Sequence, residues 1–491
     1  MKTIDLSSTQ IDIEIVNLLG HEYAMKYDSL PIRREDEHLY VAMGNPQNDT
    51  ILDLSDITGL HIVPINANPE EVRYYINQLY GVKTMHTIAS QFLTDDRAKV
   101  AASKTGVSPT SPVTRFLGSL IESGVLNRAS DIHIEPFGGE LRVRYRLDGR
   151  LVNYTQVSQD MLSNIISMLK IMCELDISEK RRPQDGHFTM EVLGEKVEFR
   201  LSTIPTTLGE KAAIRLLYNN SAYLKKHQLG FSEKDLERLT TLFSQPHGAI
   251  FVTGPTGSGK STTLTSFLSY LNDPSKNIIT IEEPVENPLP GISHINAQPS
   301  VGMDFATSLK YILRQDPDII MIGEVRDNET AQMAIRAAIT GHVVLSTLHT
   351  NDAPGVIERL TDMGIEPYLI SAALSGVISQ RLVRKICKNC ITPAKLTANQ
   401  AKSLGISAET PVFEGNGCGK CNQTGYHGRF AVYDYFIMND EMRTRMNKNP
   451  AEFSTQLRKK NGLKANAIEN LKNGSTTAEE IIGILRSDEN L

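Results

Sequence analysis

The chain has 491 residues, of which 40% are hydrophobic and 22% are charged, so it is long enough for several domains with sizeable cores. Its formal net charge of -6 excludes a global basic field that would attract nucleic acid, although it does not exclude a local basic patch. No apolar run approaches the roughly 20 residues that a membrane-spanning helix needs, and the N-terminal MKTIDLSSTQ lacks the pattern of a signal peptide. We therefore expect a cytoplasmic protein.

The pattern of apolar residues divides the chain into several regions. An apolar spacing typical of a helix runs from Ile11 to Met25, and Leu39–Met43 has the pattern of a short strand. Residues 1–82 are therefore predicted to form a small N-terminal α/β domain, to which we assign an adaptor role. Residues 83–112 end in a stretch rich in Gly, Ser and Pro and are predicted to be a linker.

Apolar residues that recur at every second position mark the next region, residues 113–222. Apolar residues alternate with arginines from Leu141 to Leu147, and Asp148-Gly149 then predicts a tight hairpin turn. We expect an α+β domain here, a sheet with packed helices.

Beyond this region short apolar strands alternate with helices, which is typical of a parallel, doubly wound α/β sheet. This pattern covers residues 223–385. A segment that bears four cysteines follows at residues 386–435, and the remaining residues, 436–491, are predicted to be helical.

A phosphate-binding loop lies near the start of the α/β region. Residues 254–261, GPTGSGKS, match G-x-x-x-x-G-K-[ST] after an apolar strand and before a helical pattern, which is the context that the motif requires. Backbone N–H groups would cradle the phosphates of ATP, the lysine would neutralise the β- and γ-phosphates, and the Ser261 hydroxyl would bind Mg²⁺. The predicted nucleotide-binding residues are Gly254, Pro255, Thr256, Gly257, Ser258, Gly259, Lys260, Ser261 and Thr262.

Hydrolysis also needs carboxylates, and two later strands end in them. Glu282 and Glu283, with Glu286 close behind, follow one apolar strand, and Gly323-Glu324 follows another. Because ligands bind at the carboxyl ends of strands in open α/β sheets, we expect both sets at the nucleotide. Glu324 is predicted to polarise the attacking water and Glu283 to support Mg²⁺; solvated surface acids are the alternative for each.

Two histidines flank a further apolar strand. His342 precedes it and His349 follows it, and a histidine at a strand end beside a γ-phosphate can sense the nucleotide through a hydrogen bond. A purely structural role is the alternative for both.

The cysteines form two C-x-x-C pairs and one single residue. Cys387 and Cys390 are separated from Cys418 and Cys421 by the 27 residues 391–417, and four thiolates favour a closed structural Zn²⁺ site. The single Cys173 is predicted to pack in a core.

These segments together resemble the type II secretion and type IV pilus assembly ATPases, in the assembly rather than the retraction branch, over roughly residues 113–435. The resemblance is carried by Ser130–Glu135 (SDIHIE), the phosphate loop, Ile281–Glu286 (IEEPVE), Arg314–Asp327 (RQDPDIIMIGEVRD), Thr340–His342 (TGH), Ser346–Asp352 (STLHTND) and the four cysteines. One departure is visible: the acidic segment of the family commonly reads Glu-Asp-Pro, and here it is Glu282-Glu283-Pro284.

The resemblance implies a homohexamer whose RecA-like domain is preceded by a PAS-like α+β domain that moves against it. It also implies that ATP hydrolysis pushes an inner-membrane platform protein, so that the chain sits peripherally at the cytoplasmic face of the inner or plasma membrane. Arg200 and Arg215, on two predicted neighbouring strands, resemble the arginines that family members aim at the nucleotide; solvated strand-face arginines are the alternative.

The N-terminal domain resembles the second half of the N-terminal module of pilus assembly ATPases. Tyr27–Ile32 (YDSLPI) and Val41–Pro46 (VAMGNP) carry this likeness. The preceding half, with its Arg-Leu-Gly repeats, is not found, so binding of cyclic di-GMP is not expected.

Two other functions fit the same fold: a nucleic-acid motor, which the net acidity disfavours, and a scaffold that binds ATP without turnover, which intact Lys260 and Glu324 disfavour. No nucleic-acid partner is expected. The cargo, pilin or a secreted enzyme, stays open, and we favour pilus assembly.

Overall fold

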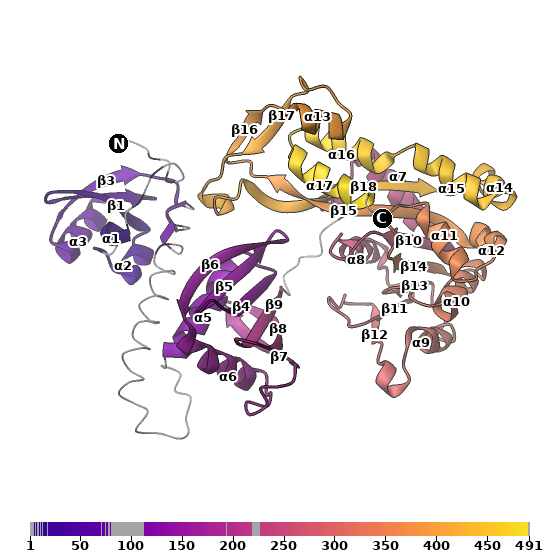
Figure 1. Ribbon diagram of the computed structural model, residues 1–491, viewed down its shortest axis with the longest axis horizontal. Coiled ribbons are helices and arrows are strands. Elements are labelled where there is room, and N and C mark those ends of the chain that lie inside the picture. The colour runs from indigo at the N-terminus through magenta and orange to yellow at the C-terminus, as the bar shows by residue number, and fades with distance from the viewer. Residues whose placement is uncertain are drawn as a thin grey trace. The chain divides into compact units, whose positions relative to one another are not determined.

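The computed structural model describes residues 112–192, 194–218 and 226–489, together with most of residues 4–79 (Figure 1). The predicted linker lies outside the described residues except for Pro112, where helix α5 begins. By its contacts the chain divides into two compact units. The first comprises Met1–Asn219 with Cys387–Cys390 and Asn416–His427, and the second comprises the remaining residues.

A three-stranded sheet forms the N-terminal region. Its elements are α1 (Ile13–Val16), α2 (His21–Lys26), β1 (Ser29–Glu35), β2 (His38–Met43), α3 (Asn48–Thr58) and β3 (His61–Asn66), with strand order β1-β2-β3. The continuous helix expected from Ile11 to Met25 is wrong, because the chain turns between α1 and α2 and buries Leu19 there. Gly20, a poor helix former, stands in extended backbone at the start of α2.

The next region is an antiparallel sheet with helices on one face. Its elements are α5 (Pro112–Leu126), β4 (Asp131–Phe137), β5 (Glu140–Leu147), β6 (Arg150–Ser158), α6 (Leu162–Met172), β7 (Gln184–Val192), β8 (Glu195–Thr206) and β9 (Gly209–Leu217), with strand order β6-β5-β4-β9-β8-β7. Alternating strand residues and the apolar stripes of both helices share one core, which leaves the arginine-bearing face of the sheet polar.

A seven-stranded sheet, order β12-β11-β13-β14-β10-β15-β18, organises the rest of the chain. Its strands are β10 (Gly248–Thr253), β11 (Ile278–Glu282), β12 (Ser293–Asn296), β13 (Ile319–Ile322), β14 (Val343–Leu348), β15 (Leu374–Ile386) and β18 (Tyr426–Ile437). Phe251 belongs to the core on one face and its neighbours Ile250 and Val252 to the core on the other. Burial on both faces explains why these strands are continuous apolar runs.

Helices cover this sheet and extend beyond it. They are α7 (Glu233–Phe243), α8 (Lys260–Leu271), α9 (Phe305–Ile312), α10 (Asn328–Ile339), α11 (Gly355–Asp362), α12 (Pro367–Ala373), α13 (Ala398–Leu404), α14 (Asp440–Lys448), α15 (Pro450–Lys459), α16 (Gly462–Lys472) and α17 (Ala478–Glu489). Strands β16 (Ile391–Ala394) and β17 (Val412–Gly415) form a separate two-stranded antiparallel sheet, whose Val412 shares a core with Val383 of β15. None of the helices in the described part of the chain combines the length and apolar character that crossing a bilayer requires.

Candidate active site and metal centre

The phosphate loop connects β10 to α8. Its glycines adopt backbone angles that suit no other residue well: φ is +145° at Gly254, +76° at Gly257 and +88° at Gly259. A Cβ atom at Gly254 would also collide with the carbonyl oxygen of Gln380. The glycines therefore allow both the turns of the loop and its close approach to β15.

Within the loop, the side chains that would meet a phosphate are held in place. Lys260 is buried, and its Nζ donates to the carbonyl oxygens of Gly254 at 2.9 Å and Pro255 at 3.1 Å. Burial lowers the pKa of Lys260, while the charge of Glu324 acts in the opposite direction. The buried Ser258 Oγ has no hydrogen-bond partner among the described residues, so the loop offers an unsatisfied donor as well as a cation.

Five residues of the loop and the first turn of α8 face solvent. Pro255, Thr256 and Gly257 are exposed at the crest of the loop, and Ser261 and Thr262 are exposed in the first turn of α8. The Ser261 hydroxyl is therefore accessible at a helix N-terminus, which suits the role of Mg²⁺ ligand predicted for it.

One residue that supports the loop has no local sequence signal. Gln380, fully buried on β15, donates from Nε2 to the Ser258 carbonyl at 2.8 Å and accepts from Thr263 Oγ1 at 3.0 Å. It joins the loop to α8 from 117 positions away along the chain from Thr263. Sequence reasoning missed Gln380 because only the tertiary fold brings it to the loop.

The two carboxylates predicted for catalysis lie together. Glu283 follows β11 and Glu324 follows β13, and these strands are paired in the sheet. Arg326 bridges them: it donates to Glu283 Oε2 at 2.9 Å and to Glu324 Oε1 by a short hydrogen bond. The hydrogen bond from Arg326 lowers the pKa of Glu324 and keeps its carboxylate ionised. Arg326 was not singled out from the sequence, although its position two residues after Glu324 was a usable signal.

The other acids of the first set differ from Glu283. Glu282 accepts from Thr280 Oγ1 at 2.8 Å and lies 3.2 Å from Nδ1 of His294, on the neighbouring strand β12. Glu286 is exposed. Of the three, only Glu283 shares an ion-pair partner with Glu324 among the described residues.

The two histidines are also in different surroundings. His349 Nε2 lies 3.4 Å from Oε2 of Glu324. His342 instead places Nδ1 3.0 Å from the carbonyl oxygen of Ala337, at the end of α10. His349 therefore belongs to the carboxylate cluster, whereas His342 contacts a backbone carbonyl in the last turn of α10.

Arg200 and Arg215 lie directly opposite each other on the adjacent strands β8 and β9. Both belong to the polar face of the six-stranded sheet, since Val197, Phe199 and Leu201 point into the core. Like charges that face each other across two strands repel, and Asp131 partly offsets this repulsion because its Oδ1 lies 3.0 Å from Nε of Arg215.

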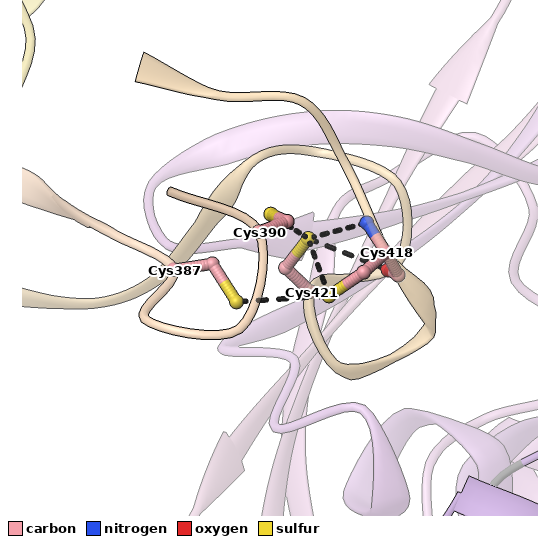
Figure 2. Close-up of side chains that lie close together, drawn as sticks. All are labelled: Cys387, Cys390, Cys418 and Cys421. Carbon is pink, nitrogen blue, oxygen red and sulfur yellow. Dashed lines mark hydrogen bonds between the residues drawn. The ribbon is translucent and has the colours of Figure 1, made fainter. Parts of the chain in front are cut away.

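The four cysteine sulfurs meet between two loops (Figure 2). Sγ–Sγ distances are 3.7 Å for Cys387–Cys418, 3.8 Å for Cys390–Cys421 and 3.7 Å for Cys418–Cys421. Four sulfurs at the usual Zn–S distance around a tetrahedral ion stand about 3.8 Å apart, so the donor set fits Zn²⁺.

Backbone donors support this centre. The N–H groups of Cys418 and Gly425 point at Cys421 Sγ from 3.2 and 3.3 Å, which favours a thiolate. Three of the four cysteines are buried, and Cys390 is partly buried, so no ligand position faces open solvent. The arrangement fits a closed structural site rather than a catalytic one.

Comparison with known proteins agrees with the motifs. The family model described as "Type II/IV secretion system protein" matches residues 107–483, and the model "MshEN domain" matches residues 1–86. Type II secretion system protein E of Dickeya dadantii is 42% identical over 77% of this chain and 76% of its own length. The type IV pilus assembly ATPase PilB of Myxococcus xanthus is 37% identical over 98% of this chain and 88% of its own.

Solved structures extend the likeness to the fold. The pilus retraction motor PilT with bound ADP is 27% identical, with a TM-score of 0.52 over 76% of this chain and 98% of that one. The Legionella pneumophila ATPase DotB, 21% identical, shares the fold alone, with a TM-score of 0.59 over 79% of this chain and 98% of its own. The expected resemblance is confirmed: a family model that spans residues 107–483, and relatives that are similar along most of their length, show that this chain belongs to the type II/IV secretion system protein family.

Proposed function

We propose that this chain is a Mg²⁺-dependent ATPase that drives type IV pilus assembly or type II protein secretion. One observation carries the proposal. The phosphate loop, with its buried Lys260, follows a strand of the same sheet whose other strands are followed by Glu283, Glu324 and His349. The names of the relatives, PilB and type II secretion protein E, supply the process.

The residues divide the work of hydrolysis. ATP takes the place of the carbonyl oxygens that Lys260 now contacts, and the lysine neutralises charge on the β- and γ-phosphates. Ser261, with support from Glu283, would hold Mg²⁺, which neutralises the charge that develops on the phosphates. Glu324, kept ionised, orients the attacking water and takes its proton, while His349 fixes the second oxygen of Glu324.

The arginines of the six-stranded sheet are assigned to the same reaction. We infer that Arg200 and Arg215 reach the nucleotide when the two units close, and that opening and closing around a homohexamer pushes an inner-membrane platform protein. The position of the two arginines directly opposite each other on the polar face, where only Arg215 of the two contacts a carboxylate among the described residues, supports this role. Residues 1–82 act as the adaptor that recruits the chain to the cytoplasmic face of the membrane, and no nucleic acid takes part.

Zinc has no part in the chemistry of this scheme. Cys387, Cys390, Cys418 and Cys421 would hold one Zn²⁺ that stabilises the two loops, because all four positions are filled by thiolates and none is left for water.

The test compares three forms of the purified full chain. The wild type should hydrolyse ATP with Mg²⁺, Lys260→Ala should lose tight ATP binding, and Glu324→Gln should bind ATP but stall. In a strain that lacks the gene, neither variant should restore surface pili or secretion. Wild-type turnover by Glu324→Gln would remove the assigned role of that carboxylate, and absence of turnover in the wild type would overturn the proposed ATPase.

A further inference from the structure

The loop between β14 and α11, residues 349–354, is tied to the nucleotide site at its N-terminal end. His349 contacts Glu324 as described above. The next residue, Thr350, donates from its backbone N–H to Thr253 Oγ1 at 3.0 Å, and the two threonine hydroxyls lie 2.7 Å apart. Thr253 is the last residue of β10, from which the phosphate loop leaves. A shift of the 349–354 loop would therefore displace the contacts that it makes with Glu324 and with Thr253, where the phosphate loop begins.

The other end of the loop is held by a helix far along the chain. Asp352 Oδ1 accepts from the N–H of Gly355, the first residue of α11, at 2.7 Å. Its Oδ2 accepts from Nε of Arg458, on α15, at 2.6 Å. The same guanidinium donates to both oxygens of Glu358, at 2.6 and 2.7 Å. One arginine thus joins two carboxylates through four hydrogen bonds, since NH2 also lies 3.4 Å from Asp352 Oδ1.

This arrangement has more hydrogen bonds than a simple ion pair, with side chains of Arg458, Asp352 and Glu358 that are 41%, 41% and 45% exposed. Isolated exposed pairs contribute little, but a planar guanidinium that grips a carboxylate with two donors fixes geometry as well as charge. Hydrogen bonds to Glu358 and then Asp352 raise the pKa of Arg458, which stays charged. The helix that bears it is itself fixed, because Phe453 and Leu457 pack in the same core as Ile357 of α11.

We propose that Arg458 is a positioning residue for hydrolysis: by holding Asp352, it sets the 349–354 loop so that His349 stays at Glu324. The C-terminal helices would then transmit their position to the catalytic carboxylate through this loop. The inference rests on the proposed ATPase function.

The first test separates positioning from substrate binding. In the full chain, Arg458→Ala should lower kcat for ATP about tenfold or more, because a small misplacement near the chemistry is costly, while KM changes by less than about threefold. Arg445→Ala is the matched control. Arg445 lies on neighbouring α14 and contacts Glu441 and Gln456, not the loop. The kcat of the Arg445→Ala variant should therefore equal that of wild type.

A second pair of variants uses the two carboxylates that share Arg458. Asp352→Asn keeps an acceptor for the N–H of Gly355 but loses the ion pair, so it should lower kcat as Arg458→Ala does. Glu358→Gln loses an equal ion pair that does not touch the loop, and its kcat should stay within about twofold of wild type. These conservative changes keep the proposal testable if Arg458→Ala folds poorly.

The third measurement asks whether Arg458 acts through His349. In a His349→Ala background, Arg458→Ala should lower kcat no further, because residues that act in one chain of contacts are not additive. Additive losses, or equal losses in Asp352→Asn and Glu358→Gln, would overturn the proposal in favour of a general structural role. If Glu324→Gln stalls hydrolysis while Arg458→Ala and Asp352→Asn retain it, the ATPase function stands and only this inference fails.

Discussion

Arg215 and Asp131 lie opposite each other on strands β9 and β4, and Arg215 Nε donates to Asp131 Oδ1 at 3.0 Å. Asp131 is largely buried, whereas the Arg215 side chain is 63% exposed. The carboxylate therefore fixes the orientation of the guanidinium and leaves it accessible to solvent. Arg200, on the other side of Arg215, has no carboxylate partner among the residues that the structure describes. The sheet therefore has two neighbouring arginines on its polar face, of which Arg215 is oriented by a carboxylate and Arg200 is not.

We expect Arg200→Ala and Arg215→Ala each to lose most of the hydrolysis rate. Arginines that stabilise charge on a transferred phosphoryl group contribute about a thousandfold or more in related chemistry, while ATP affinity should change only modestly. The measurement is steady-state turnover and nucleotide binding of each purified variant that still assembles. Near-normal turnover in both variants would leave these arginines as surface charges.

The second prediction concerns the bond between Arg326 and Glu324. The arginine lowers the pKa of Glu324, so activity that needs the ionised carboxylate persists to lower pH and is lost as pH falls through that pKa. In Arg326→Gln the pKa should rise toward its usual value, and the acid limb of the kcat profile should move to higher pH. Arg336→Gln, at an exposed arginine on α10, is the control and should leave the limb in place. An unmoved limb in Arg326→Gln would show that Arg326 does not set the ionisation of Glu324.

Motifs that depend on neighbouring residues were the easiest to predict. The phosphate loop follows from glycines at three positive-φ positions, and the meeting of Glu283 with Glu324 follows from the rule that strand ends share one edge. The sequence assigned Mg²⁺ support to Glu283, but it could not give the partner of either glutamate, because the partners depend on which residues the fold brings to each side of the strand end. Successive residues point to opposite sides, so Glu282 meets His294 on β12 and Glu283 meets Arg326.

Residues that act across long chain separations could not be predicted. Gln380 reaches the phosphate loop, and Arg458 reaches Asp352 over 106 positions. Neither residue carries a local pattern, because a single glutamine or arginine on a strand or helix is ordinary. Their roles arise only when the fold brings distant elements together.

The third prediction concerns the thiols. Metal analysis of protein purified without chelators should find one Zn²⁺ per chain, held by the four clustered cysteines. Under native conditions an alkylating reagent should modify none of the five cysteines, and removal of the metal should expose four. Cys173 should stay unmodified until the protein unfolds, because burial raises the pKa of its thiol to about 11. Alkylation of the four with metal present, detected by mass spectrometry, would contradict the site.

The fourth prediction concerns the N-terminal region. It has its own sheet and its own core, so its deletion should leave the rest of the chain folded. Removal of residues 1–82 should therefore spare ATP hydrolysis but abolish recruitment to the membrane. Cell fractionation with the partner proteins present measures recruitment, and turnover of the purified truncated chain is the control. Unchanged recruitment would assign the adaptor role to another region.

The last prediction concerns the stability of the six-stranded region. Lys170 of α6 is 1% exposed, and its Nζ donates to Glu210 Oε1 and to the carbonyl oxygen of Glu179, both at 2.6 Å. The Glu210 side chain is only 10% exposed. Removal of one partner from such a pair leaves an uncompensated buried charge, which typically costs about 3–5 kcal/mol. Lys170→Met should therefore destabilise this region severely.

The matched control is another lysine–glutamate pair of similar length. Lys310 and Glu329 are 2.5 Å apart but 53% and 60% exposed, so Lys310→Met should cost less than about 1 kcal/mol. Calorimetry of the full chain should show a transition lowered by about 10 °C or more in Lys170→Met and hardly moved in Lys310→Met. Adding Glu210→Leu to Lys170→Met should recover part of the loss, because an apolar pair removes the unpaired carboxylate. Equal effects at the two lysines would mean that the buried charge of Glu210 is solvated or neutralised in another way.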